Sequence, residues 1–146
     1  MFNNILIVCL GNICRSPMAE AFFKKQILEV KPEIIISSAG IRAVIDRPAV
    51  PEVHHLLHQH GIDVSRHRGR QLTSDMIANA DLILTMEKTH KKEIEIAFPF
   101  SYGKVLLMGR WSNFEIPDPY QQSLEAFDQC FELIQRAWGD WKDRIC

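Results

Sequence analysis

The apolar residues of this chain gather in short, almost uninterrupted runs that alternate with longer amphipathic stretches. Two such runs are Asn4 to Leu10 and Ala80 to Met86, and shorter ones occupy Glu33 to Ser38 and Lys104 to Met108. A strand that is buried on both faces produces a continuous apolar run, as in a parallel sheet covered by helices. We therefore predict that these segments are strands of one parallel sheet.

The stretches between these runs have the spacing and the boundary residues of helices. Helices are predicted from Ser16-Pro17 to about Val30, from Pro51 to His60 and from about Glu87 to Ile96, since proline is favoured in the first helical turn. A last helix is predicted from about Ser123 to Arg144. It carries large apolar residues at a spacing that is typical of a core face: Phe127, Phe131, Ile134, Trp138 and Trp141.

Strands that alternate with helices predict an α/β fold. The expected architecture is a doubly wound, four-stranded parallel sheet with helices on both faces and flavodoxin-like topology. No repeat or flexible linker divides the chain, so residues 1–146 are expected to form one domain. In such folds, ligands bind beyond the carboxyl ends of the strands. The first predicted strand places Cys9 and Leu10 at such an end.

Composition and charge exclude several classes of function. The formal net charge of -1 and the pI near 6.6 provide no basic field for binding nucleic acid. No apolar run approaches the roughly 18 residues that span a bilayer, and the first residues lack the features of a signal peptide. We therefore expect a cytoplasmic protein with no stable membrane insertion.

The chain has four cysteines: Cys9, Cys14, Cys130 and Cys146. No two have the C-x-x-C spacing of a zinc site, and in a cytoplasmic protein a catalytic or redox role is favoured over structural disulfides. Cys130 is expected to pack in the last helix and Cys146 to be exposed. His54 and His58 lie one helical turn apart, but no acid or thiol completes a ligand set. We interpret these histidines as a solvated helix face, and no metal site is predicted.

The stretch VCLGNICRSP, Val8 to Pro17, runs from the end of a predicted strand into a predicted helix N-terminus. Backbone N–H groups and the helix dipole make such a loop an anion site. Gly11 can adopt a positive φ, and Asn12 tolerates the left-handed region better than most residues. We expect the following residues to bind a phosphate: Leu10, Gly11, Asn12, Ile13, Cys14 and Arg15.

Two side chains of this stretch carry chemistry. Arg15 has a planar guanidinium that can hold two phosphate oxygens and that stays charged at any working pH. The same positive surroundings stabilise a thiolate, which makes Cys9 a candidate nucleophile. Taken alone, a cysteine and an arginine at this spacing also fit a buried thiol beside a solvated arginine.

The whole stretch VCLGNICRSP resembles the phosphate-binding signature of the low-molecular-weight protein tyrosine phosphatases. Three further segments resemble the pattern of this family, so the likeness extends over nearly the full chain: Ser38-Ala39-Gly40, His67-Arg68-Gly69-Arg70-Gln71 and Asp118-Pro119-Tyr120. The resemblance implies that Asp118 is the general acid. Pro117 and Pro119 have fixed φ angles and would hold its carboxyl group in place.

The resemblance implies a reaction of two steps. Cys9 attacks phosphorus while Arg15 and the loop amides stabilise the equatorial oxygens and Asp118 protonates the leaving oxygen. Water then hydrolyses the thiophosphoryl enzyme, and inorganic phosphate is the product. By the same resemblance, Asn12 braces the loop and Ser16 donates its hydroxyl to the thiolate. This scheme requires no metal and no other cofactor.

The resemblance also implies a pocket for an aryl phosphate. Tyr120 and Ile13 are expected to line it, together with Ile41 in the aliphatic segment Ile41 to Ile45. Eukaryotic members commonly have a second tyrosine where this chain has Gln121. The pattern looks most like the bacterial branch that works with tyrosine autokinases in capsule or exopolysaccharide production. The expected partner is therefore a phosphotyrosine protein, in particular a tyrosine autokinase.

Cys14 belongs to the same loop as Cys9 and raises a second hypothesis. Oxidation of Cys9 to a sulfenic acid could be trapped as a Cys9–Cys14 disulfide, which would resist further oxidation. The alternative interpretation of Cys14 is a small buried residue.

Two other classes of function compete with a phosphatase. A thioredoxin-coupled arsenate reductase has the same fold and a similar loop, but its chemistry needs further cysteines as an electron relay, and none lies between Cys14 and Cys130. A phosphate-binding regulatory module without turnover is the third class. It leaves the nucleophile, the guanidinium and the acid without a reason to occur together.

Overall fold

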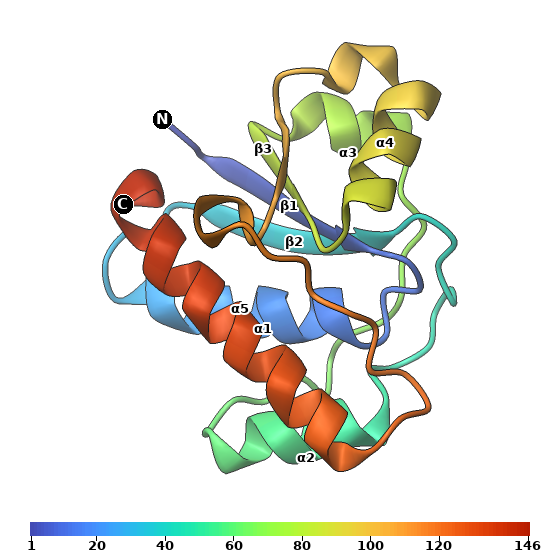
Figure 1. Cartoon of the computed structure of the whole chain (residues 1–146). Coiled ribbons are helices and arrows are strands. Elements are labelled where there is room, and N and C mark those ends of the chain that lie inside the picture. Colours follow the sequence, from blue (N-terminus) through green and yellow to red (C-terminus); the bar gives the residue numbers. More distant parts are fainter.

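The strands form one parallel sheet with the order β2-β1-β3-β4. A computed structural model describes residues 1–146 (Figure 1). The strands are β1 (Asn4–Cys9), β2 (Ile35–Gly40), β3 (Leu82–Thr85) and β4 (Val105–Leu107). All the predicted strands are therefore present, but β2 begins and ends two residues later than predicted. Its register explains the shift, because β2 follows β1 to the end, where Cys9 stands opposite Gly40.

Helices cover both faces of the sheet, as predicted. The helices are α1 (Arg15–Leu28), α2 (Pro51–Gln59), α3 (Ser74–Asn79), α4 (Lys88–Ala97) and α5 (Leu124–Ile145), with short 3₁₀ helices at Pro99–Ser101 and Arg110–Ser112. The sequence pattern did not predict α3, because six residues are too few to show helical periodicity. The hydroxyl of Thr73 caps this helix by accepting a hydrogen bond from the Met76 N–H.

The side chains of β1 alternate between two apolar cores. Ile5, Ile7 and Cys9 belong to a large core with α1, α2 and α5, whereas Leu6 and Val8 belong to a smaller core with α3 and α4. Figure 1 shows these two groups of helices on opposite faces of the sheet. A central strand buried on both faces explains why its sequence is continuously apolar. No helix of the structure combines the length and the apolar character that crossing a membrane requires.

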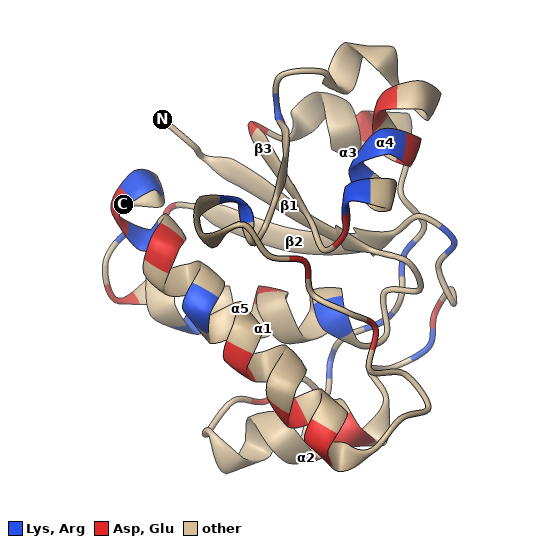
Figure 2. Cartoon of the chain, in the orientation of Figure 1, with Lys and Arg blue, Asp and Glu red and all other residues tan.

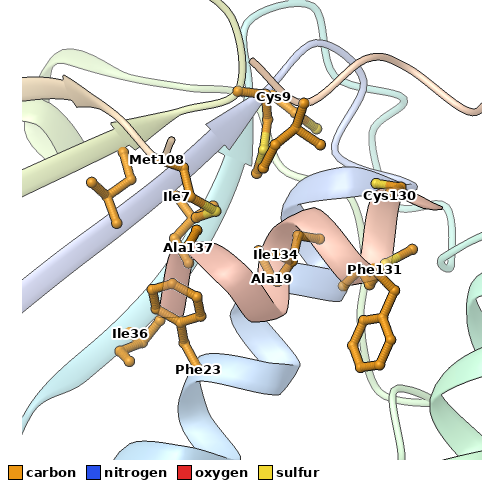
Figure 3. Packing of buried hydrophobic residues seen from close by; sticks show 14 of the residues in the cluster. Ile7, Cys9, Ala19, Phe23, Ile36, Met108, Cys130, Phe131, Ile134 and Ala137 are labelled. Carbon is orange, nitrogen blue, oxygen red and sulfur yellow. The ribbon is translucent and has the colours of Figure 1, made fainter. Parts of the chain in front are cut away.

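The last helix, α5, covers the large core along its whole length. Figure 3 shows Ile134 and Ala137 of α5 beside Ala19 of α1, below the end of β1. The indole N–H of the buried Trp141 donates a hydrogen bond to the Met108 carbonyl at 2.8 Å, so this polar group is satisfied. The predicted apolar stripe thus packs α5 against the large core, in which α5 contacts α1 and α1 contacts β1.

A glycine at the end of β2 lets the loop after β1 approach closely. A Cβ atom on Gly40 would lie 2.7 Å from the Leu10 carbonyl oxygen and 3.0 Å from the Gly11 carbonyl carbon. Real side chains essentially never make such contacts with backbone atoms. The pair β1 and β2 therefore needs glycine at position 40 for the loop of residues 10–14 to take its course.

We predict that Gly40→Ala destabilises the protein by about 1–3 kcal/mol, the usual cost of overpacking against atoms that cannot move freely. Gly139→Ala is the matched control, because a Cβ there meets nothing within 4 Å. In the interior of α5, this control should raise the free energy of unfolding by about 0.5–1 kcal/mol. Urea unfolding of the two variants measures both effects. Equal stability changes would contradict the close approach at Gly40.

Candidate active site

The loop of residues 10–14 connects β1 to α1 and curls around the end of the central strand. Asn12 is its left-handed residue, with φ 59°. Gly11 has no positive φ, and a Cβ there would make only ordinary contacts, so the loop does not use the positive φ that glycine allows at this position. α1 begins at Arg15, one residue before the predicted start, and no side chain caps it. Its first N–H groups therefore remain available to an anion.

The thiol of Cys9 is buried and receives hydrogen bonds from this loop. The Asn12 N–H donates to Cys9 Sγ at 3.3 Å, and Ser16 Oγ lies 2.9 Å from the same sulfur. Ser16 Oγ already accepts a hydrogen bond from Asn12 Nδ2 at 2.7 Å. Its own proton is therefore free to point at the sulfur. Two donors therefore converge on this sulfur atom, one from the loop and one from the first turn of α1.

Almost every polar group of Asn12 has a hydrogen-bond partner. Besides Ser16, its Nδ2 donates to Ser38 Oγ at 3.0 Å, and its Oδ1 accepts from the Arg70 N–H at 3.0 Å. Its carbonyl oxygen accepts from His67 Nε2 at 2.7 Å. Burial lowers the pKa of His67, which favours the neutral ring. These bonds hold the left-handed residue of the loop from three different segments of the chain.

The guanidinium of Arg15 is anchored on one side only. Its Nη1 donates to Glu87 Oε2 at 2.6 Å and to the Ile116 carbonyl at 2.8 Å. Its Nη2 lies 3.8 Å from Asp118 Oδ2, and neither Nε nor Nη2 makes a hydrogen bond. The side chain is 2% exposed, so the charge is held in place by burial and by the Glu87 carboxylate. The free edge can hold two oxygens of an anion.

Asp118 reaches the same cavity from the loop before α5. Its Oδ1 accepts a hydrogen bond from the Tyr120 N–H at 3.0 Å, which orients the carboxyl group. The cavity has a volume of about 220 Å³ and is lined by the following residues: Cys9, Leu10, Gly11, Ile13, Cys14, Arg15, Arg42, Val44, Asp118 and Tyr120. The structure thus brings the carboxyl group of Asp118, which is distant in sequence, to the thiol of Cys9 and the guanidinium of Arg15, which lie in one short stretch.

One expected wall residue lies elsewhere. Ile41 does not line the cavity, because its side chain packs on the smaller core beyond β2. The chain turns after this residue, and Val44 lines the cavity in its place together with Arg42. Arg42 is also paired with Glu93, at 2.9 Å between Nη1 and Oε2. Ile13 and Tyr120 line the cavity, and Asn12 lies behind it.

The other cysteines form no disulfide bond, and the histidine-rich helix α2 forms no metal site. All four cysteines are free; Cys130 is buried and Cys146 is exposed, as predicted. Burial raises the pKa of the Cys14 thiol, and it raises that of Cys130 to about 12. Both groups are therefore thiols at neutral pH, and the redox role of Cys14 stays a prediction. No three histidine, cysteine or acidic side chains are grouped as metal ligands would be.

Comparisons with known proteins agree with this geometry. The sequence model of the low molecular weight phosphotyrosine protein phosphatases matches residues 4–145. The chain belongs to this family. A probable low molecular weight protein-tyrosine-phosphatase, EpsP of Ralstonia nicotianae, is 43% identical over 99% of this chain and 97% of its own length. The similarity of this phosphatase to the family therefore extends over almost the whole chain.

Two solved structures show the same fold at high similarity. The tyrosine phosphatase Wzb from Escherichia coli K30, in complex with sulphate, has a TM-score of 0.93 and 36% identity, with 100% of both chains covered. Vibrio vulnificus Wzb in complex with benzylphosphonate has a TM-score of 0.92 and 39% identity, with 99% of both chains covered. These likenesses establish a protein-tyrosine phosphatase with a four-stranded α/β fold.

Sequence reasoning missed several residues that shape the site of this phosphatase. Glu87 follows β3 at the carboxyl edge of the sheet, and this position was the available signal for a role near the loop. Ser38 and His67 lie in segments that carried the family resemblance, but their link to Asn12 depends on tertiary contacts. Val44 belongs to the aliphatic segment Ile41 to Ile45 that the sequence placed at the pocket, but only the structure shows that this residue of the segment faces the cavity.

We predict that Glu87→Gln lowers kcat/KM by about 10–100-fold, because a displaced Arg15 no longer matches the reacting phosphate. Glu132→Gln, on the exposed face of α5, is the matched control and should keep full activity. Steady-state kinetics should be combined with phosphate inhibition constants. A purely structural role of Glu87 would lower the melting temperature without weakening phosphate binding, and this outcome would contradict the prediction.

The pKa values of His67 and His90 predict how stability depends on pH. Burial lowers both, and the nearby Arg15 lowers the pKa of His90 further. In the unfolded chain these two histidines bind protons as the pH falls through about 6.5, whereas in the folded protein they remain neutral to lower pH. Their contribution to the free energy of unfolding should therefore be fully present above about pH 6.5 and decrease below it.

The double variant His67→Gln/His90→Gln tests this origin. Urea unfolding measured between about pH 7 and about pH 5 should show a shallower loss of stability in the variant than in the wild type. An identical slope in both proteins would show that other groups produce the dependence.

Proposed function

We propose that this phosphatase hydrolyses phosphotyrosine in proteins through a cysteinyl-phosphate intermediate. The observation that carries the proposal is the meeting of Cys9, Arg15 and Asp118 around one cavity, with donors aimed at the Cys9 sulfur. A nucleophile, a positive clamp and an acid are the parts that transfer of a phosphoryl group requires when no metal takes part. The steps follow from where these groups lie.

In the first step, the Cys9 thiolate attacks phosphorus and an S–P bond forms as the P–O bond to the tyrosine breaks. The free edge of Arg15 and the N–H groups of the loop stabilise the equatorial oxygens. Asp118 gives its proton to the leaving phenolate oxygen, so that tyrosine departs as a neutral phenol. Ser16 and Asn12 stabilise the thiolate before the attack.

In the second step, a water molecule attacks phosphorus while Asp118, now a carboxylate, takes its proton. The S–P bond breaks, Cys9 returns as a thiolate that Ser16 and the Asn12 N–H stabilise, and inorganic phosphate leaves. Asp118 thereby regains the proton that it lost, so the cycle closes without another reactant. Every proton in this scheme moves at a group that lines the cavity.

The walls of the cavity support an aromatic phosphate ester as the substrate. Ile13, Val44 and Tyr120 provide apolar contact for a ring whose phosphate reaches the loop. The related Wzb proteins bind sulphate in one case and benzylphosphonate, a phosphonate on a benzyl group, in the other. By analogy, the loop of this chain holds the tetrahedral anion and the walls hold the ring.

The natural substrate in this proposal is a bacterial tyrosine autokinase in the cytoplasm. The support is the resemblance of the sequence pattern to the bacterial branch of the family, and the chain is similar to the bacterial phosphatases EpsP and Wzb over its full length. The four free cysteines fit a reducing compartment. An exposed pocket edge formed by Arg42, Val44 and Tyr120 is open to a protein segment that carries the phosphotyrosine.

Hydrolysis of a phosphotyrosine peptide tests the proposal. Cys9→Ser should abolish turnover, and Asp118→Asn should lower kcat by about 10²–10⁴, because the leaving phenolate loses its proton donor. Turnover should resist EDTA. Asp128→Asn, on the exposed face of α5, is the control for loss of one carboxyl group and should leave kcat unchanged.

The intermediate itself can be trapped. Rapid acid quenching of the wild-type enzyme during turnover of phosphotyrosine peptide should leave phosphate bound to Cys9, detectable by mass spectrometry of the quenched protein. No phosphoprotein in the wild type, together with full turnover in Cys9→Ser, would overturn the covalent mechanism. Equal hydrolysis of phosphoserine and phosphotyrosine peptides would overturn the substrate assignment.

A further inference from the structure

A second, polar cavity lies on the outer side of the loop of residues 10–14, which is called the phosphate loop below. It shares no lining residue with the cavity that contains Cys9. It has a volume of about 260 Å³, no hydrophobic residue lines it, and its lining consists of Glu20, Lys24, Ser37, Ser38, Arg66, His67, Arg68 and Arg70. The lining comes from α1, from β2 and from the segment between α2 and α3. The proposed reaction uses none of the charged groups of this cavity.

Positive charge dominates this cavity although the chain as a whole carries a formal net charge of -1. Glu20 is the only acid among the lining residues, against one lysine and three arginines. Its carboxylate is already engaged, since it accepts from Lys24 Nζ at 2.7 Å and from Ser38 Oγ at 2.6 Å. Figure 2 shows blue positions on the chain between α2 and α3 where it passes α1. The cavity thus lacks the acids that would neutralise its cations.

The three guanidinium groups have no carboxylate partners. Arg66 makes no hydrogen bond or ion pair, and Arg68 donates only to the backbone carbonyls of Ser65 and His67. Arg70 uses its Nε for the Ser38 carbonyl and leaves its two terminal nitrogens free. Planar forks of this kind match the paired oxygens of a phosphoryl group or of a carboxylate.

The backbone of residues 66–70, which carries these arginines, is fixed by close packing and hydrogen bonds. A Cβ on the buried Gly69 would lie 2.2 Å from the Val44 carbonyl oxygen, so the backbone packs tightly there. The Gly69 N–H donates to the Arg47 carbonyl at 2.8 Å. His67 and the Arg70 N–H are fixed by their hydrogen bonds to Asn12. The arginine side chains therefore project from a fixed backbone, which reduces the entropy lost on binding.

We propose that this cavity is a binding site for a small, multiply charged phosphoryl compound, with inorganic pyrophosphate as its simplest form. Several cations, one engaged acid and hydroxyl groups at the floor are the lining that such an anion requires. The site is separate from the one where substrate phosphate binds, and the inference goes beyond the proposed function. An anion bound here contacts the segment that holds Asn12 and so lies directly behind the phosphate loop.

Amide NMR resonances can follow pyrophosphate while benzylphosphonate saturates the first cavity. Residues 66–70 and Ser37 should show saturable shifts that are distinct from those of residues 10–15. In Arg66→Ala/Arg68→Ala, the dissociation constant should rise by about tenfold or more, because two charged forks are lost. Lys92→Ala/Lys142→Ala removes two exposed charges from α4 and α5 and should stay within about twofold of the wild type.

Two further arms keep the test decisive. Arg66→Lys/Arg68→Lys keeps the charges but removes the forks and should fall between the wild type and the alanine variant. Raising the salt from about 0.01 M to about 0.15 M shortens the Debye length from about 30 Å to about 8 Å and should weaken binding in the wild type. Thermal unfolding should show that all variants fold.

Three outcomes would overturn the proposed site. The first is that pyrophosphate causes no saturable shifts at residues 66–70, and the second is that it causes shifts at residues 10–15 alone. The third is that Arg66→Ala/Arg68→Ala binds pyrophosphate as tightly as the control Lys92→Ala/Lys142→Ala does. A failure of the proposed catalytic function would show itself differently. It would appear as an absence of benzylphosphonate shifts at residues 10–15 and of phosphotyrosine turnover, with the pyrophosphate shifts at residues 66–70 intact.

Discussion

The hydrogen bonds of Asn12 are the constraint on which the active site depends. This residue holds a left-handed conformation in the middle of the phosphate loop, and its side chain joins Ser16, Ser38 and the Arg70 N–H. Its own N–H points at the Cys9 sulfur. The bonds give a short loop a fixed shape, and a fixed shape lets backbone donors stabilise an anion without reorganising when it binds. The same residue therefore holds both the proposed nucleophile and the loop that is proposed to bind the anion.

The two edges of the Arg15 guanidinium have different surroundings. Glu87 and the Ile116 carbonyl take the donors of one nitrogen, so the buried guanidinium is paired and oriented before any substrate arrives. The other edge faces the cavity near Asp118. The fold brings these groups together at the carboxyl edge of the sheet, where β1, β3 and the loop before α5 converge. A doubly wound sheet places ligands at this edge in general.

Much of the fold and the core of the site could be predicted from local patterns. Apolar runs identified the strands, the stripe on α5 identified its buried face, and the left-handed conformation of Asn12 is one that asparagine tolerates better than most residues. Prediction failed where a long-range contact decides the outcome. Ile41 packs on the smaller core while Val44 reaches the cavity, because the backbone turns between them. Likewise, α3 is too short for its sequence to show a period.

The sequence by itself determined the alternation of strands and helices, the position of the thiol at the end of a buried strand, and the presence of an arginine at the start of the next helix. These features arise from residues close together in the chain, where steric preference and apolar spacing act directly. Only the tertiary structure decided that Glu87 anchors Arg15, that His67 and Arg70 hold Asn12, and that unpaired arginines gather behind the loop. Contacts of this kind depend on which distant segments the packing of the two cores brings side by side, and no local preference encodes them.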